Sequence, residues 1–256
     1  ASDIIFDVLK ITSMMSALGH IQLVKILSDG HMIIAGPTTN KELNEIICLM
    51  KTYVDKVFID GAFNRMTFAN IELIDGIILA AGAAENPIMN KTIDKTKMIV
   101  EFFNLKKSQH IKKIPKETLI IKTKNHKYVF NDKLTETLKH AVAEVNQKID
   151  WIYIKGAITP RFINLFTRSM MMGFTLICDD PTKLLISQKE FDNILKLKIN
   201  IQTIHRCPLL FVTINPYSPT GNHYDEKEFM RKMKQEINVP IYNVVKMEEE
   251  HVKIKS

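Results

Sequence analysis

Four loops of this chain combine glycine with polar or acidic side chains of the kind that hold ligands. They are Gly36–Asn40, Asp60–Arg65, Gly82–Glu85 and Asn215–Asn222. All four follow apolar runs that predict buried strands, and the first three contain the small residues typical of tight turns into helices. In open α/β sheets, ligands collect beyond the carboxyl ends of the strands. The sequence therefore predicts that a binding site, if the chain has one, is assembled from these loops; the fourth, Asn215–Asn222, is also typical of a solvent loop.

The first loop, Gly36–Asn40, has two interpretations. Gly36 lets a ligand approach the backbone, the hydroxyls of Thr38 and Thr39 can donate hydrogen bonds, and free amides at a helix start attract anions. The spacing of Thr39 and Glu42 is also that of a capping box, which stabilises a helix start without any ligand. The loop thus predicts either a phosphate site or a helix cap.

Asp60 is the most informative acidic residue. It comes directly after the apolar run Lys56–Ile59 and before Gly61, where nucleotide-binding sheets place the carboxylate that orients magnesium. Arg65 has the reach to pair with that carboxylate or with a phosphate. The alternative is an Asp60–Arg65 ion pair that only fixes the loop. The nucleotide-binding set predicted here, with Asp60 as the metal ligand, is Gly36, Thr38, Thr39, Asp60, Gly61, Arg65 and Gly82.

The usual catalytic motifs are missing from the sequence. It contains no phosphate-binding G-x-x-x-x-G-K-[ST], no dinucleotide-binding G-x-G-x-x-G and no G-x-S-x-G elbow. The eight histidines are dispersed, and the three cysteines (Cys48, Cys178 and Cys207) are too scattered to suggest a zinc cluster or a disulfide framework. No self-contained catalytic set is visible, so we name no catalytic residue.

The positive charge of the chain is concentrated in one segment. The 35 basic and 28 acidic residues give a net charge of +7, and residues 104–133 hold nine lysines against Glu117 and Asp132. Such a run is typical of a solvated connector, but it also suits an acidic partner, a phosphate or RNA. The residues that we predict to contact a partner are Asp29, Lys106, Lys107, Lys112 and Lys113.

Positioning these loops requires an α/β fold. Strand-like runs alternate with helical patterns, which predicts mostly parallel sheets built from βαβ units, with a hairpin around Asn125. The predicted strands include 4–11, 21–27, 31–35, 56–60, 76–81, 151–154, 174–178, 199–204, 209–214 and 241–245. The predicted helices are 43–50, 88–103, 134–145, 160–171, 191–195 and 229–237. We expect an α/β half over 1–105, a lysine-rich connector and hairpin over 106–133, and a second α/β half over 134–256. The run Val54–Ala62 has a similar counterpart in Ile149–Ala157. This similarity indicates either that the two halves are duplicated or that parallel strands and tight βα turns use the same few residue types.

Composition limits the class of protein. With 256 residues, 46 % apolar and 25 % charged, the chain is typical of globular proteins rather than of disordered or fibrous ones. Its apolar runs fall short of the roughly 18–20 residues needed to span a bilayer, and its opening does not read as a secretion signal. We therefore expect a cytoplasmic protein. The chain starts without methionine and almost directly in a predicted strand, which suggests a fragment lacking its N-terminus.

Three stretches, taken in order, resemble a known family. They are Leu27–Gly30 with Ala35–Pro37, then Phe58–Arg65, then Asp75–Ala83. Their order and spacing are similar to those of clostridial accessory proteins found with lysine aminomutase, the reactivase small partners that work beside a larger MutS-like ATPase. The resemblance is dense over about residues 5–105.

The resemblance implies a function that composition and spacing do not show. The family's client is an aminomutase that depends on adenosylcobalamin and pyridoxal phosphate and is inactivated during turnover. This chain would then help to exchange damaged cobalamin, with ATP and Mg²⁺ as implied ligands and cobalamin bound by the client. Two alternatives stay open: a nucleotide-binding enzyme that uses Asp60 and Gly36–Asn40, and a nucleic-acid-associated protein that uses the lysines of 104–133. The second lacks aromatics interleaved with its lysines.

Overall fold

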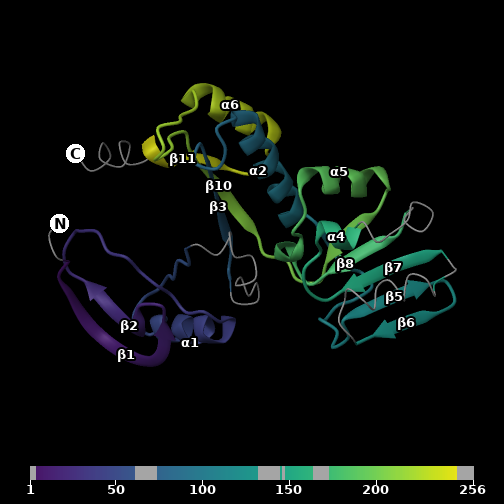
Figure 1. The fold of residues 1–256 in the computed structure, drawn as a ribbon, viewed down its shortest axis with the longest axis horizontal. Coiled ribbons are helices and arrows are strands. Elements are labelled where there is room, and N and C mark those ends of the chain that lie inside the picture. Colours follow the sequence, from purple (N-terminus) through teal and green to yellow (C-terminus); the bar gives the residue numbers. More distant parts are fainter. Residues whose placement is uncertain (1–3, 61–73, 132–144, 146–147, 164–172, 247–256) are drawn as a thin grey trace. The chain divides into compact units, whose positions relative to one another are not determined.

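The computed structural model describes residues 4–60, 74–131, 145, 148–163 and 173–246, and these combine helices with three sheets (Figure 1). The chain divides into two compact units, residues 1–73 and residues 74–256. The expected mixture of helices and sheets is confirmed. The sheets themselves are mixed, with parallel and antiparallel pairs, rather than plainly built from βαβ units.

Unit 1 (residues 1–73) contains a β-hairpin followed by a helix. Strands β1 (Phe6–Ser16) and β2 (Gly19–Ile26) pair antiparallel, with Gly19 at a φ of +110° in the tight turn between them. A connection this short cannot join parallel strands, so the two strands predicted at 4–11 and 21–27 depart from the mostly parallel sheets expected. Helix α1 (Asn40–Met50) follows as expected. The strands predicted at 31–35 and 56–60 are wrong, because those residues have no strand partners.

The described part of unit 1 has almost no interior. Within residues 4–60, Ile47 on α1 is the one buried residue. Both faces of the hairpin carry large apolar side chains that stay exposed. A two-stranded hairpin is at best marginally stable in water without a covering layer. The apolar residues that made these strands predictable therefore lie largely on the surface.

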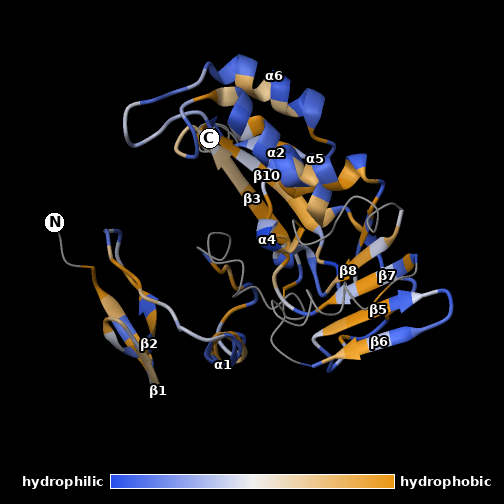
Figure 2. Cartoon of the chain, turned by 45° about the vertical axis from the view of Figure 1, so that its right-hand side comes forward, coloured by the Kyte–Doolittle hydropathy of each residue, from blue (hydrophilic) through white to orange (hydrophobic). Residues whose placement is uncertain are grey.

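Unit 2 (residues 74–256) contains a three-stranded parallel sheet. Its strands, in the order β11-β10-β3, are β3 (Ile77–Gly82), β10 (Leu209–Asn215) and β11 (Ile241–Asn243). Helices α2 (Met89–Phe103) and α6 (Glu226–Glu236) pack together beside it (Figure 1). The hydroxyls of Thr92 and Tyr224, 2.9 Å apart, join α2 to the loop before α6. Figure 2 shows hydrophobic residues along β3 and hydrophilic ones along α6.

The second sheet of unit 2 has six strands in the order β4-β9-β8-β7-β5-β6. Strands β4, β9, β8 and β7 run parallel, whereas β5 pairs antiparallel with both β7 and β6. The bounds are β4 (Lys106–Lys107), β5 (Leu119–Thr123), β6 (Lys127–Phe130), β7 (Ile149–Ile154), β8 (Thr175–Cys178) and β9 (Asn200–Thr203).

The main core of unit 2 lies on one face of this six-stranded sheet. Side chains of β5, β7, β8 and β9 pack there against α2, α4 (Pro160–Ile163) and α5 (Gln188–Lys196). On the opposite face a smaller cluster of Ile120, Tyr153, Ile177 and Ile204 is covered partly by Ile111 and Trp151. A short 3₁₀ helix, η3 (Pro181–Lys183), follows β8.

The lysine-rich segment is part of the six-stranded sheet. Its residues supply β4, the hairpin β5-β6 and the loop between them, so the predicted limits at 105 and 133 both fall within unit 2. The hairpin around Asn125 is confirmed.

The similar runs 54–62 and 149–157 have no common structure over their described residues, since only the second run forms a strand. Within the described ranges, no helix has the length and apolarity that a membrane crossing needs.

Several predicted elements are confirmed within a few residues. They are the strands at 76–81, 151–154, 174–178, 199–204, 209–214 and 241–245 and the helices at 88–103, 191–195 and 229–237. The predicted helix over 134–145 lies outside the described residues except for its last position. Of the predicted helix 160–171, only Pro160–Ile163 is described, as α4.

Candidate functional site

The loop Gly36–Asn40 forms the capping box that the sequence allowed. One Glu42 carboxylate oxygen accepts hydrogen bonds from the backbone N–H and hydroxyl of both Thr38 and Thr39, at 2.9–3.2 Å. The Thr39 hydroxyl in turn accepts from the Glu42 N–H. The Thr39 hydrogen bonds are the main reason that the pKa of Glu42 is lowered. The donors predicted to hold a phosphate thus already hold a carboxylate, and the phosphate role of Gly36, Thr38 and Thr39 stays a prediction.

Asp60 is exposed and follows irregular backbone rather than the predicted strand. Gly61 and Arg65 lie outside the described residues, so neither the Asp60–Arg65 pair nor the magnesium role is tested. Among the described side chains, no three histidines, cysteines or carboxylates are grouped closely enough to hold a metal ion. Asp60 as a metal ligand therefore stays a prediction.

Gly82 has a clear structural role at the end of β3. A Cβ at this position would lie 2.4 Å from the carbonyl oxygen of Asn215 on the neighbouring strand β10. The same oxygen accepts a 3.0 Å hydrogen bond from Ala83. The close backbone approach expected for Gly82 therefore involves the neighbouring strand. Gly82 belongs to unit 2, whereas Gly36, Thr38, Thr39 and Asp60 belong to unit 1.

The residues predicted to meet a partner fall into two groups. Asp29 is exposed in unit 1, next to Ser28, whose hydroxyl accepts a 2.8 Å hydrogen bond from the Ile5 N–H. Lys106 and Lys107 form the exposed strand β4, while Lys112 and Lys113 are exposed on the loop that follows. Their accessibility agrees with a contact role, which stays a prediction.

Lys112 also lines a pocket that the sequence did not reveal. The pocket has a volume of about 430 Å³ and lies beside the second face of the six-stranded sheet. We call it the lysine–tryptophan pocket; its lining residues are His110, Ile111, Lys112, Pro115, Glu117, Ile120, Lys122, Lys127 and Trp151.

The strand register aligns three of these side chains. Lys122 lies directly opposite Lys127 on β6 and opposite Trp151 on β7. Directly opposite residues in antiparallel strands share a face, so the two lysines and the tryptophan form a row across three strands. The His110 ring stacks on Trp151 with centroids 5.7 Å apart and an interplanar angle of 21°.

The loop that carries His110 is anchored at both ends. At its start, the buried Ser108 donates its N–H to the Thr203 carbonyl at 2.8 Å, and its hydroxyl accepts from the N–H groups of His110 and Ile111. At its end, the Lys155 ammonium donates to the carbonyls of Pro115 and Lys116, both at 3.3 Å. These contacts fix the loop against β9 and the end of β7.

A second grouping missed by the sequence analysis is the buried pair of Tyr153 and Asp179. The Tyr153 hydroxyl donates a 2.7 Å hydrogen bond to the carboxylate of Asp179, just beyond the carboxyl end of β8. Burial raises the pKa of Asp179, although hydrogen bonds from Tyr153 and the Gly156 N–H oppose it. Burial also raises the pKa of Tyr153. The signal available in the sequence was an acidic pair, Asp179 and Asp180, directly after an apolar strand.

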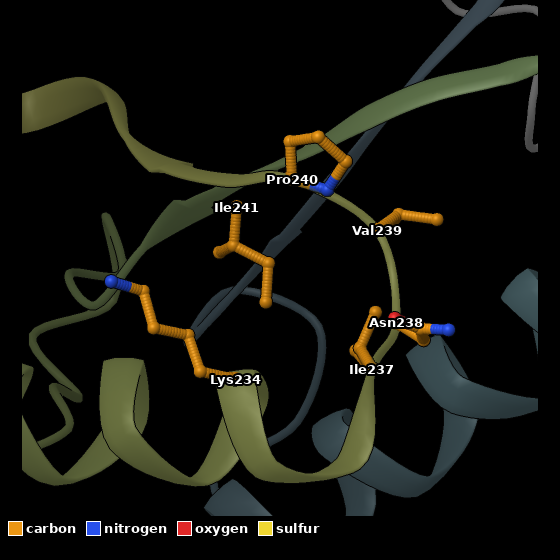
Figure 3. Close-up of a pocket in the computed structure, with 6 residues that line it drawn as sticks. All are labelled: Lys234, Ile237, Asn238, Val239, Pro240 and Ile241. Atoms are coloured by element: carbon orange, nitrogen blue, oxygen red, sulfur yellow. The ribbon is translucent and has the colours of Figure 1, made fainter.

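A further hollow, of about 460 Å³, lies where α6 ends and the chain turns into β11 (Figure 3). Lys234 and Ile237 come from α6 and the following turn, and Ile241 points from the strand toward the helix. The hollow lies at the amino end of β11, away from the carboxyl ends where α/β sheets bind ligands. Its single charged group gives it little means of fixing a ligand.

The comparisons with known proteins give no relative. No family model, no curated protein and no solved structure matches this chain.

Proposed function

We propose that this chain is an accessory factor that docks on a client enzyme, and specifically that it takes part in ATP-dependent reactivation of an adenosylcobalamin-dependent aminomutase. The client would bind the cobalamin, and a MutS-like ATPase would act as partner. ATP and Mg²⁺ would be used by that partner or by this chain. The resemblance over residues 5–105 suggests the client.

The observation that carries the docking role is the exposed apolar surface of unit 1. The exposed fractions are 63 % for Ile11 on β1, 67 % for Leu18 in the hairpin turn and 89 % for Ile33 in the loop after β2. Exposed apolar side chains recur along residues 5–34, and large exposed apolar patches are typical of protein–protein contact sites. Because Ile47 alone is buried among residues 4–60, a partner covering this surface would supply apolar contacts that these described residues lack.

A docking role also fits what a reactivating factor must do. Such a factor can shift its client between conformations only if it binds one conformation more tightly than another. A broad apolar surface supports this discrimination, because a change in client shape alters how much of the surface is covered. Burial contributes about 25 cal/mol for each Å² of apolar area, so modest changes in fit alter affinity measurably.

The experiment is co-purification and rescue. We expect the chain to co-purify with the aminomutase and to restore its activity after inactivation when the ATPase partner, ATP and intact cofactor are supplied. The double variant Ile11→Thr/Ile33→Thr should weaken binding and rescue at least about tenfold, since each residue loses apolar contact area.

The matched control is Val129→Thr/Leu195→Thr, which makes similar changes at exposed apolar positions of unit 2. It should bind and rescue like the unmodified chain. Absence of both co-purification and rescue would overturn the proposal. An equal loss in the two double variants would overturn the assignment of docking to unit 1.

A further inference from the structure

We propose that the lysine–tryptophan pocket binds a nucleotide unit, with the base against the His110–Trp151 pair and the phosphate among the ammonium groups of Lys112, Lys122 and Lys127. This proposal stands apart from the reactivation role and uses only residues of unit 2. It also differs in location from the phosphate site predicted at Gly36–Asn40.

The charges in the pocket favour an anion. Its lining residues include three lysines and a single carboxylate, that of Glu117. Within the described part of the chain, none of the three lysines takes part in a salt bridge. Lys122 and Lys127 are direct cross-strand neighbours, an arrangement of like charges that costs stability unless an anion compensates it. A phosphate bound between them would remove that repulsion.

The other walls favour a flat ring. Trp151 is only partly buried, and its stack with His110 forms an aromatic edge to the pocket. Ile111, Pro115 and Ile120 add apolar surface. Stacking of a base on an aromatic side chain is favourable, and every base offers a flat face for it. A pocket of about 430 Å³ is within the usual range for small-ligand sites.

Glu117 helps to distinguish a nucleotide from other anions. An acidic peptide would bring carboxylates toward Glu117 and would leave the aromatic edge without a matching group. A nucleotide offers ring N–H and ribose hydroxyl groups that can donate hydrogen bonds to the Glu117 carboxylate. The mixture of three cations, one acceptor and an aromatic edge therefore suits a base and phosphate on one ligand better than either group alone.

Free nucleotides and single-stranded nucleic acid both carry a base and a phosphate, and the experiment distinguishes these two classes of ligand. Trp151 is the only tryptophan of the chain, so its fluorescence reports on this pocket alone. We would titrate the protein with uridine monophosphate, with a short oligouridylate and with inorganic phosphate. The proposal is supported if uridine monophosphate or the oligouridylate quenches the Trp151 fluorescence at concentrations where inorganic phosphate causes no change.

The relative affinities identify the source. Tighter binding of the oligouridylate, weakening steeply with salt, would indicate a single strand, whereas equal affinity per nucleotide would indicate a free nucleotide. The variant Lys112→Gln/Lys127→Gln should lose at least about tenfold in affinity. If a strand is bound, its log–log salt slope should fall by about 1.4, or about 0.7 for each phosphate contact removed.

The control is Lys189→Gln/Lys196→Gln, which removes the same charge from exposed lysines of α5 that do not line the pocket. It should bind with unchanged affinity. The proposal is overturned if no ligand quenches Trp151, if phosphate alone quenches it as well as the nucleotide does, or if both double variants lose affinity equally. None of these results depends on whether the chain reactivates an aminomutase.

Discussion

The carboxyl group of Asp179 shows how far a single residue can depart from its ordinary chemistry. Asp179 is 6 % exposed and lies between the Tyr153 hydroxyl and the Gly156 N–H. Removal from water disfavours the charged form more than the two hydrogen bonds favour it, so the pKa of Asp179 is raised. A carboxyl group in this state costs stability once it is ionised.

This predicts a specific pH dependence for Asp179→Asn. The pKa of Asp179 is higher in the folded protein than in the unfolded chain, so the folded protein holds the Asp179 proton more tightly. The stabilisation of the fold that results is fully present below the unfolded pKa. It is lost as pH rises through the folded pKa. The asparagine variant does not titrate. Its free energy of unfolding should therefore improve relative to the unmodified protein as pH rises from about 3.5 to 7.

The measurement is urea unfolding of both proteins across that pH range, with Tyr153→Phe as a third sample. Loss of the Tyr153 hydroxyl removes a hydrogen bond that favours the charged carboxylate, so Tyr153→Phe should lose more stability with rising pH than the unmodified protein. A constant difference between Asp179→Asn and the unmodified protein at every pH would contradict the assignment.

At the scale of elements, the sequence pattern predicted the helices and strands whose hydrogen-bond partners are close along the chain. The hairpin β5-β6 and helix α2 follow the periodicity of their own residues. The runs 31–35 and 56–60 are as apolar as real strands but have no partner in the described structure. Strand formation depends on pairing that the run itself does not encode, which is why β-propensity is so dependent on context.

The pairing of β3 with β10 gives an element-scale prediction. Gly82→Ala would place a Cβ 2.4 Å from the Asn215 backbone oxygen, which no side-chain movement can relieve. The two strands must separate locally, at a cost of about 1–3 kcal/mol by comparison with overpacked cores. Chemical denaturation should show this loss, whereas Gly36→Ala, where a Cβ meets nothing within 4 Å, should cost much less. Equal stability of the two variants would contradict the role given to Gly82.

The candidate pocket could be predicted only in part. The lysines of 104–133 are visible in the sequence as a charged run, and Lys112 was among those expected to contact a partner. Trp151 was not, because it reaches Lys122 through the register of β5 with β7 rather than through spacing along the chain. The nucleic-acid interpretation lacked Trp151 for the same reason, because this residue comes from another strand.

At the scale of the whole molecule, the two units differ in how much interior they have. The six-stranded sheet of unit 2 buries Leu119, Ile121, Ile152 and Ile154 completely, whereas residues 4–60 bury only Ile47. Local opening is easiest where few apolar contacts must be broken. We therefore expect the amide hydrogens of β1 and β2 to exchange with solvent on the order of a hundredfold faster than those of β7 and β8.

Hydrogen–deuterium exchange followed by mass spectrometry of peptides would measure this contrast in the isolated chain. Addition of a docking client should slow exchange in the hairpin and leave β7 and β8 unchanged. Equal protection of the two regions in the isolated chain would show that unit 1 is already covered, and would remove the reason for assigning docking to it.

Strand β4, at one end of the six-strand order, has a consequence for how separate copies of this protein behave in concentrated solution. It is two residues long, and both are lysines. An uncovered sheet margin tends to recruit further strands, and natural proteins discourage such growth with short, positively charged margins. Lys106 and Lys107 thus help to keep neighbouring molecules from joining their sheets into aggregates, whichever partner they meet.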